Sequence, residues 1–158
     1  MEINKLIKYV FCLIFIMMQL SCFSQLQLGN KLNSKNIVQK QKILISPSQI
    51  QDGYIIENNN VIYSVCVNYN DEIYFISTED PNFKHQELHV GSLFKEIKNV
   101  KIKQKINGWG YVIENDSDWK YVFRTSIIKN SSRITFFFKY DPKLKTDSIE
   151  KTEIRVRF

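Results

Sequence analysis

The chain has 158 residues, a formal net charge of +6 and 44% hydrophobic residues. This length suits one domain, which can bury roughly two thirds of its unfolded surface and so needs neither a metal nor a disulfide to fold. Basic and acidic residues alternate along the sequence, as in residues 150–155, which is typical of a solvated face and argues against nucleic acid as a partner.

Residues 1–24 have the three parts of a bacterial secretory signal. Lys5 and Lys8 precede an apolar run, and small residues follow between Ser21 and Ser24. Gln19 interrupts the run after about half of the roughly 20 apolar residues that a membrane-spanning helix needs. We therefore expect a cleaved signal peptide and an exported protein, either periplasmic or extracellular.

Two cleavage sites fit this segment. Cleavage after Ser24 would release a secreted chain that begins at Gln25. Lipoprotein processing would instead make Cys22 the acylated first residue, with Ser21 as the small residue before it. The membrane is an expected partner only if Cys22 carries a lipid.

Cys66 is the cysteine that remains after either cleavage, so the domain is not a disulfide scaffold. It lies in an apolar, β-branched run at residues 61–68, which favours a small buried hydrophobe. The alternative is a reactive thiol, which needs a neighbouring base or a helix N-terminus to lower its pKa.

The next elements indicate an antiparallel meander. Residues 25–42 are polar and without a clear period, so we expect a flexible tether that leads to a single domain at residues 43–158. The segments expected as strands are separated by turns rich in Asn and Asp. They are residues 54–56, 61–68 and 73–78, and a short apolar stretch at 43–45 precedes them.

A short helix is expected around residues 91–98. Ser92 can cap it, and Leu93, Phe94 and Ile97 fall on one face. A helix of about two turns is marginal alone, so it must pack against the sheet.

Residues 100–106 return to a period of two, which places Lys101, Lys103 and Lys105 in a row towards water. Residues 108–113 and 119–123 then predict a hairpin with large side chains on one face. A turn centred on Asp116 would set Ile113 opposite Trp119, Tyr111 opposite Tyr121 and Trp109 opposite Phe123.

Two further strands complete the expected α+β fold, mainly antiparallel sheet with one short helix. Residues 134–140 are apolar on both faces and predict an interior strand. Residues 153–158 alternate basic with apolar side chains and predict an edge strand.

The aromatic hairpin has two interpretations. Its side chains can pack in the core, or Trp109, Tyr111, Trp119 and Tyr121 can form an open face that anchors a partner. In the second case, Lys101, Lys103 and Lys105 would supply an electrostatic rim suited to an acidic protein or an anionic glycan.

The two histidines do not form a recognisable metal motif. His85 and His89 are four residues apart, but Gln86 stands where the metalloprotease motif requires Glu, and no third ligand is suitably spaced. We expect neither a metal nor another cofactor. A catalytic alternative would pair Cys66 with one of these histidines.

The middle of the chain, about residues 55–125, resembles a group of uncharacterised small exported proteins and lipoproteins of bacteria. The likeness lies in residues 73–84, Val90-Gly91-Ser92 before a short helix, 108–111 and 118–120. This chain lacks the glycine that such proteins carry before the helix, at residues 87–89. The Gly-Ser opening is also similar to small modules of β-lactamase inhibitor proteins and outer-membrane assembly lipoproteins.

From these observations we expect an exported, non-catalytic binding module that acts on a protein or another envelope component. An inhibitor or immunity-type protein would be one concrete form. The alternatives are a small periplasmic hydrolase that uses Cys66 with His85 or His89, and a structural envelope lipoprotein anchored at Cys22.

Overall fold

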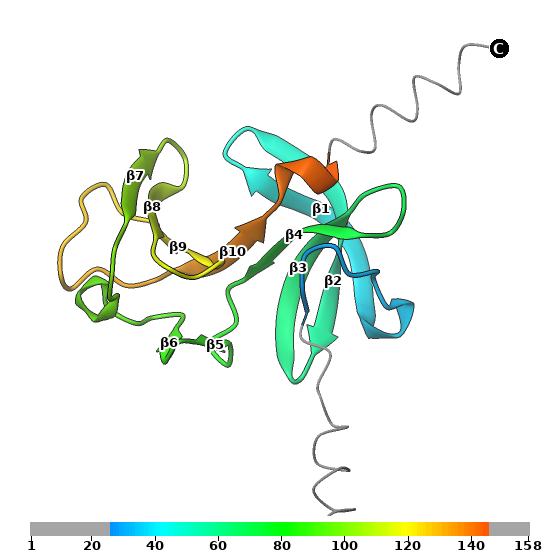
Figure 1. Ribbon diagram of the computed structural model, residues 1–158, viewed down its shortest axis with the longest axis horizontal. Helices are drawn as coiled ribbons and strands as arrows, with labels where there is room; N and C mark the ends of the chain where they lie inside the picture. Colours follow the sequence, from blue (N-terminus) through cyan, green and yellow to red (C-terminus); the bar gives the residue numbers. More distant parts are fainter. Residues whose placement is uncertain (1–25, 146–158) are drawn as a thin grey trace, which may run out of the picture.

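The computed structural model describes residues 26–145. The expected signal peptide, Cys22 and the expected strand at 153–158 lie outside this part. Within it, eight strands form one antiparallel sheet in the order β1-β2-β3-β4-β10-β9-β8-β7 (Figure 1). Their bounds are β1 Ile37–Ser46, β2 Gln49–Asn58, β3 Val61–Val67, β4 Ile73–Thr78, β7 Ile102–Ile106, β8 Gly110–Glu114, β9 Lys120–Phe123 and β10 Phe136–Tyr140.

The remaining described elements are short. β5 (Lys84–His85) pairs with β6 (Leu88–His89) in a separate hairpin, and the 3-10 helices are η1 (Ser34–Asn36) and η2 (Phe94–Glu96). One helical turn follows β10 at residues 142–145. The expected fold class is confirmed, because the molecule is mainly antiparallel sheet with a short helix inside residues 91–98.

The sheet consists of two four-stranded halves joined at its centre. β2 to β4 follow one another as the expected three-stranded meander, with turns that place Asn59, Asn60 and Asp71 at positive φ, and β1 precedes them as a further strand. The chain then crosses to the far edge at β7 and returns through β8 and β9 to β10, which pairs with β4 (Figure 1). The interior position expected for residues 134–140 is confirmed by β10.

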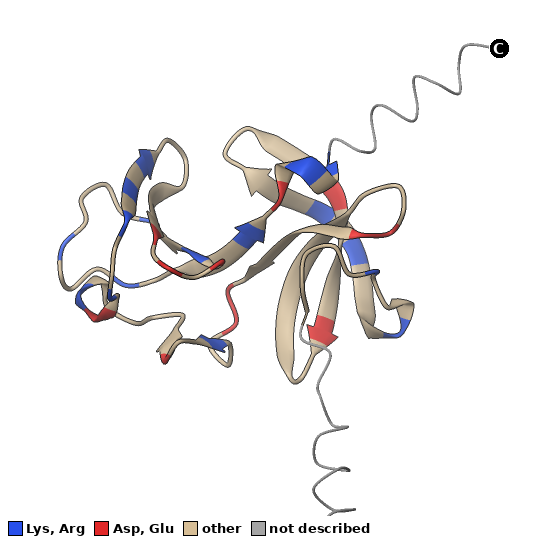
Figure 2. Cartoon of the chain, viewed as in Figure 1, with Lys and Arg blue, Asp and Glu red and all other residues tan. Residues whose placement is uncertain are grey.

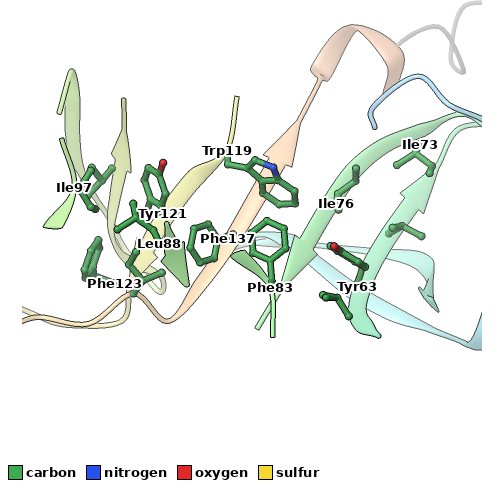
Figure 3. Packing of buried hydrophobic residues seen from close by; sticks show 14 of the residues in the cluster. Tyr63, Ile73, Ile76, Phe83, Leu88, Ile97, Trp119, Tyr121, Phe123 and Phe137 are labelled. Atoms are coloured by element: carbon green, nitrogen blue, oxygen red, sulfur yellow. The ribbon is translucent and has the colours of Figure 1, made fainter. Parts of the chain in front are cut away.

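Both faces of the central strands are buried, because alternate side chains join two different hydrophobic clusters. The first cluster contains Ile113, Tyr121 and Phe137, and the second contains their neighbours Val112 and Val122 on the opposite face. Phe83 and Leu88 cover the first cluster, as Figure 3 shows.

The sheet curls around the second cluster. Ile43 and Ile45 of β1 belong to it, as does Trp109 from the turn between β7 and β8. A Cβ placed on Gly108 in this turn would lie 3.2 Å from Cβ of Pro47, between β1 and β2. The turns at the two ends of the sheet are therefore neighbours in space.

The expected boundary between a tether at 25–42 and the domain at 43–158 is wrong. Residues 37–42 belong to β1, and Leu26, Leu28 and Leu32 pack against the first cluster. The amide of Gly29 also donates to the carbonyl of Ile73 at 2.8 Å. The first half of β1 is polar because it is an edge strand with exposed side chains on both faces.

The expected cap of the short helix is also wrong. Ser92 lies outside η2, and its Oγ accepts a hydrogen bond from the amide of His89 at 3.0 Å. Glu96 Oε2 accepts instead from the amide of Leu93, also at 3.0 Å. Ser92 cannot enter a helix because its carbonyl accepts from the amide of Ile134, which holds it beside the chain before β10.

Within residues 26–145, no helix has the length and apolar character that a membrane-spanning segment needs.

Candidate binding surface

The β8–β9 hairpin has a different register from the expected one. Ile113 lies opposite Tyr121, and Tyr111 lies opposite Phe123. The connecting turn is longer because its side chains bond to its own backbone: Asn115 Oδ1 accepts from the amide of Ser117 at 3.0 Å. Trp119 is thereby left in the loop before β9, and the expected pairing of Trp119 with Ile113 is wrong.

Trp109 lies on the opposite face of the sheet from Tyr121. It is 5% exposed and packs edge-on against Phe136 and Phe138, with ring centroids 5.2 and 5.1 Å away. Gly110 permits this arrangement because its φ of +96° ends the turn and starts β8 in a conformation that other residues avoid. The large side chains of the hairpin therefore do not share one face.

Trp119 and Tyr121 are core residues. They are 4% and 0% exposed, and both rings pack against Phe137 in the first cluster (Figure 3). The ammonium of the buried Lys139 lies 4.7 Å from the Trp119 ring and forms an ion pair with Asp118. With Trp109 also buried, three of the four expected anchors cannot contact a partner, and the core interpretation of the hairpin is correct.

Tyr111 lies beside two of the three lysines of the expected rim, Lys103 and Lys105. Lys101, Lys103 and Lys105 are exposed, and Lys103 Nζ lies 5.5 Å from the Tyr111 ring and 5.4 Å from the Phe94 ring. Lys105 Nζ lies 6.0 Å from the same tyrosine ring. Lys101 pairs with Asp116 at 2.5 Å, and this bond is the main reason that the pKa of Asp116 is lowered.

The structure adds basic residues that the sequence did not connect to this row. The segment 124–135 folds back on η2, where the amide of Phe94 donates to the carbonyl of Ser132 at 2.8 Å. Figure 2 shows Lys and Arg on β7, on η2 and on this segment at the same end of the molecule. We define the basic surface as the exposed side chains Lys95, Lys101, Lys103, Lys105, Lys129 and Arg133.

No local sequence pattern indicates that these groups meet. Lys129 and Arg133 lie far along the chain from β7, and the segment that carries them has no strand or helix among its described residues. Ile102 alternates with the lysines along β7 and belongs to the other face of the strand, where it is 47% exposed. The apolar groups that do lie against these charges are the rings of Phe94 and Tyr111.

An open hollow of about 530 Å³ lies beside the basic surface. Its lining residues, all with polar side chains except Leu88, are Gln86, Glu87, Leu88, Glu96, Lys98, Asn99, Asn115 and Asp116. Some of these groups already bond to one another: the side-chain amide of Asn115 donates to Gln86 Oε1 at 3.3 Å and to the carbonyl of Lys98 at 3.5 Å. Among the described residues, no three His, Cys, Asp or Glu side chains are arranged to hold a metal ion.

The structure does not bring Cys66 to either histidine. Cys66 is 0% exposed in the second cluster, and burial raises the pKa of its thiol to about 12. His85 packs beside Trp119 of the first cluster, on the other face of the sheet, and burial lowers its pKa. His89 is exposed, with Nδ1 2.7 Å from the carbonyl of Val90. The alternative of a hydrolase that pairs Cys66 with a histidine is therefore not supported by the described structure.

Comparisons with protein families, with characterised proteins and with solved structures give no match.

Proposed function

We propose that the protein is an exported binding module that recognises an acidic partner, a protein or another envelope component, through its basic surface. The observation that supports this most directly is the row of exposed lysines on and just before β7, at the same end of the molecule as Lys95, Lys129 and Arg133. An inhibitor or immunity-type protein is one form that this function could take. The segment 1–24 supports export, and Cys22 is the residue that would carry a lipid.

The chemistry of the surface suits such a partner. In the described part of the chain, Lys103 and Lys105 form no salt bridge, and their ammonium groups lie over aromatic rings. A ring holds an ammonium group without cancelling its charge, so the charge stays available to a carboxylate. A fixed cluster of like charges speeds the encounter with an oppositely charged partner.

The proposal is tested by removing the charges of β7 and, separately, the same number of charges from elsewhere. The first variant replaces Lys101, Lys103 and Lys105 with Gln. The matched control replaces Lys35, Lys40 and Lys42, which are exposed on η1 and the opposite edge strand β1. Both variants have the same net charge, so only the position of the lost charges differs.

Binding to immobilised poly-L-glutamate is measured at low and high salt for each protein. We expect the β7 variant to associate about tenfold more slowly than the wild type at low salt, with a much smaller difference at high salt. The control variant should stay close to the wild type. Equal losses in the two variants would show that net charge alone governs binding and would refute the proposed surface.

Anchoring at Cys22 is a separate proposal. The intact mass of the protein isolated from its native host distinguishes an acylated Cys22 from a chain that begins at Gln25.

A further inference from the structure

β7 ends the sheet, so its outer backbone edge has no partner strand among the described residues. We infer that the acidic partner contributes an extended segment that pairs with this edge as a further strand, and that the segment alternates acidic with uncharged residues. The inference rests on the proposed function, because it specifies how the basic surface recognises its partner.

The two faces of β7 define the sequence that such a segment needs. Lys103 and Lys105 lie on the face of Tyr111, whereas Ile102 and Gln104 alternate with them and belong to the other face. Directly opposed side chains on paired strands are about 4.5–5.5 Å apart at Cβ, and opposite charges at such positions stabilise the pairing. Acidic residues would therefore face the lysines, and uncharged residues would face Ile102 and Gln104.

The register of β7 is regular enough to accept another strand. β7 pairs with β8 without a register shift from Ile102 to Ile106. The opposite edge strand, β1, has register shifts between Ile37 and Gln39 and between Leu44 and Ser46. Bulges twist an edge and protect it from pairing, so β1 is the less suitable of the two edges.

Charge also decides which kind of strand the edge of β7 favours as a partner. A second copy of β7 would bring lysines opposite lysines, and opposed like charges destabilise a strand pair. Lysines on an edge strand protect a protein against unspecific pairing, yet the same row attracts a strand that carries carboxylates. An acidic segment is therefore favoured over self-association.

The test uses three nine-residue peptides of alternating Glu and Thr. One peptide is unmodified, the second is N-methylated at every Glu, and the third is N-methylated at every Thr. Successive backbone N–H groups of a strand point to opposite sides, so in the antiparallel orientation, which is the commoner one, only one of the two methylated sets faces β7. N-methylation removes those donors and leaves the charge of the peptide unchanged.

We expect the unmodified peptide to bind at low salt, one methylated peptide to bind at least about tenfold more weakly, and the other to match the unmodified one. Hydrogen exchange should show new protection of β7 amides on binding, with none at β1. Equal affinities for all three peptides would overturn strand addition while the charge-based function stands. Failure of the unmodified peptide, where poly-L-glutamate still binds, would also overturn strand addition alone.

Discussion

The two edges of the sheet differ in shape and in how their charges are neutralised. β1 has ten residues, carries two register shifts, and turns Ile43 and Ile45 into the second cluster. β7 has five residues, pairs regularly with β8, and buries none of its side chains fully. β1 is therefore packed more firmly into the core, and the outer backbone edge of β7 is the more accessible to a partner strand.

Lysines on the two edges also have different surroundings. Lys42 of β1 pairs with Asp52 at 2.8 Å, whereas Lys103 of β7 lies over the rings of Phe94 and Tyr111. An ion pair reduces the field that a lysine presents to a partner, but an aromatic ring does not. Lysine content alone thus does not identify a binding edge, because its neighbours decide what it can attract.

The largest effects are expected from glycines that lie behind each edge. A Cβ on Gly110 would lie 2.2 Å from the carbonyl oxygen of Phe123, and its φ is +96°. A Cβ on Gly53, behind β1, would lie 2.4 Å from the carbonyl oxygen of Val65 without a positive φ. In urea denaturation, Gly110→Ala should lower the unfolding free energy by roughly 3 kcal/mol and Gly53→Ala by roughly 2 kcal/mol.

A third glycine supplies the control for these two variants. Gly91 has a φ of +98°, and a Cβ added to it would meet no atom of the described residues within 4 Å. Gly91→Ala therefore measures the backbone strain alone, roughly 1 kcal/mol. If Gly110→Ala lowers the unfolding free energy by no more than Gly91→Ala does, β8 and β9 can move apart to admit a Cβ. That result would contradict the tight packing behind the β7 edge.

A smaller effect is expected from the aromatic contacts of β7. Lys103→Gln should lower the unfolding free energy by about 0.5–1 kcal/mol, because it removes an ammonium group from the rings of Phe94 and Tyr111. Lys40→Gln on β1 should change it by less than about 0.5 kcal/mol, as for most surface substitutions. Equal changes in urea denaturation would argue against a specific role of the rings.

The smallest effects are expected from the two aspartates that pair with edge lysines. Hydrogen bonds from Lys42 and Lys101 lower the pKa of Asp52 and Asp116 from the ordinary value of 3.8. A carboxyl whose pKa is lowered by folding contributes stability above its unfolded pKa and loses that contribution as the pH falls. Asp52→Asn and Asp116→Asn should therefore be slightly destabilising at pH 7, and this loss should shrink as the pH falls below 3.8 and through the lowered pKa of each carboxyl.

NMR titration of the carboxyl carbons checks this prediction directly. Lys42→Gln should return the pKa of Asp52 towards 3.8 and leave Asp116 unchanged, and Lys101→Gln should do the reverse. Since both carboxyls are exposed, added salt should weaken the two shifts alike. A shift that survives the loss of its lysine would contradict the assigned cause.

The sequence predicted most strands of the described sheet because their apolar periods reflect burial. β10 was recognisable as interior, since Phe136, Phe137 and Phe138 leave no polar face for solvent. β1 was missed because its first half is exposed on both sides and carries no such period. An edge strand of this kind is held mainly by backbone pairing, which side-chain patterns do not report.

The candidate site was predictable only in part. The exposed row at Lys101, Lys103 and Lys105 follows from alternation, which fixes the side on which side chains lie once a strand forms. The faces of Trp109 and Trp119 depend instead on Gly110 and on the side-chain bonds of the β8–β9 turn. One residue more or less in a turn exchanges the two faces of a strand, so small turn details decide which aromatics are buried.

By itself, the sequence determined the antiparallel strands, the interior place of β10 and the lysine row of β7, because each depends on local alternation along one strand. Tertiary structure alone decided that the aromatic hairpin faces the core, that Cys66 and His85 lie on opposite faces, and that Lys95, Lys129 and Arg133 join the lysine row. These outcomes depend on how distant segments cover a curled sheet, and contacts of that kind leave no period in the sequence.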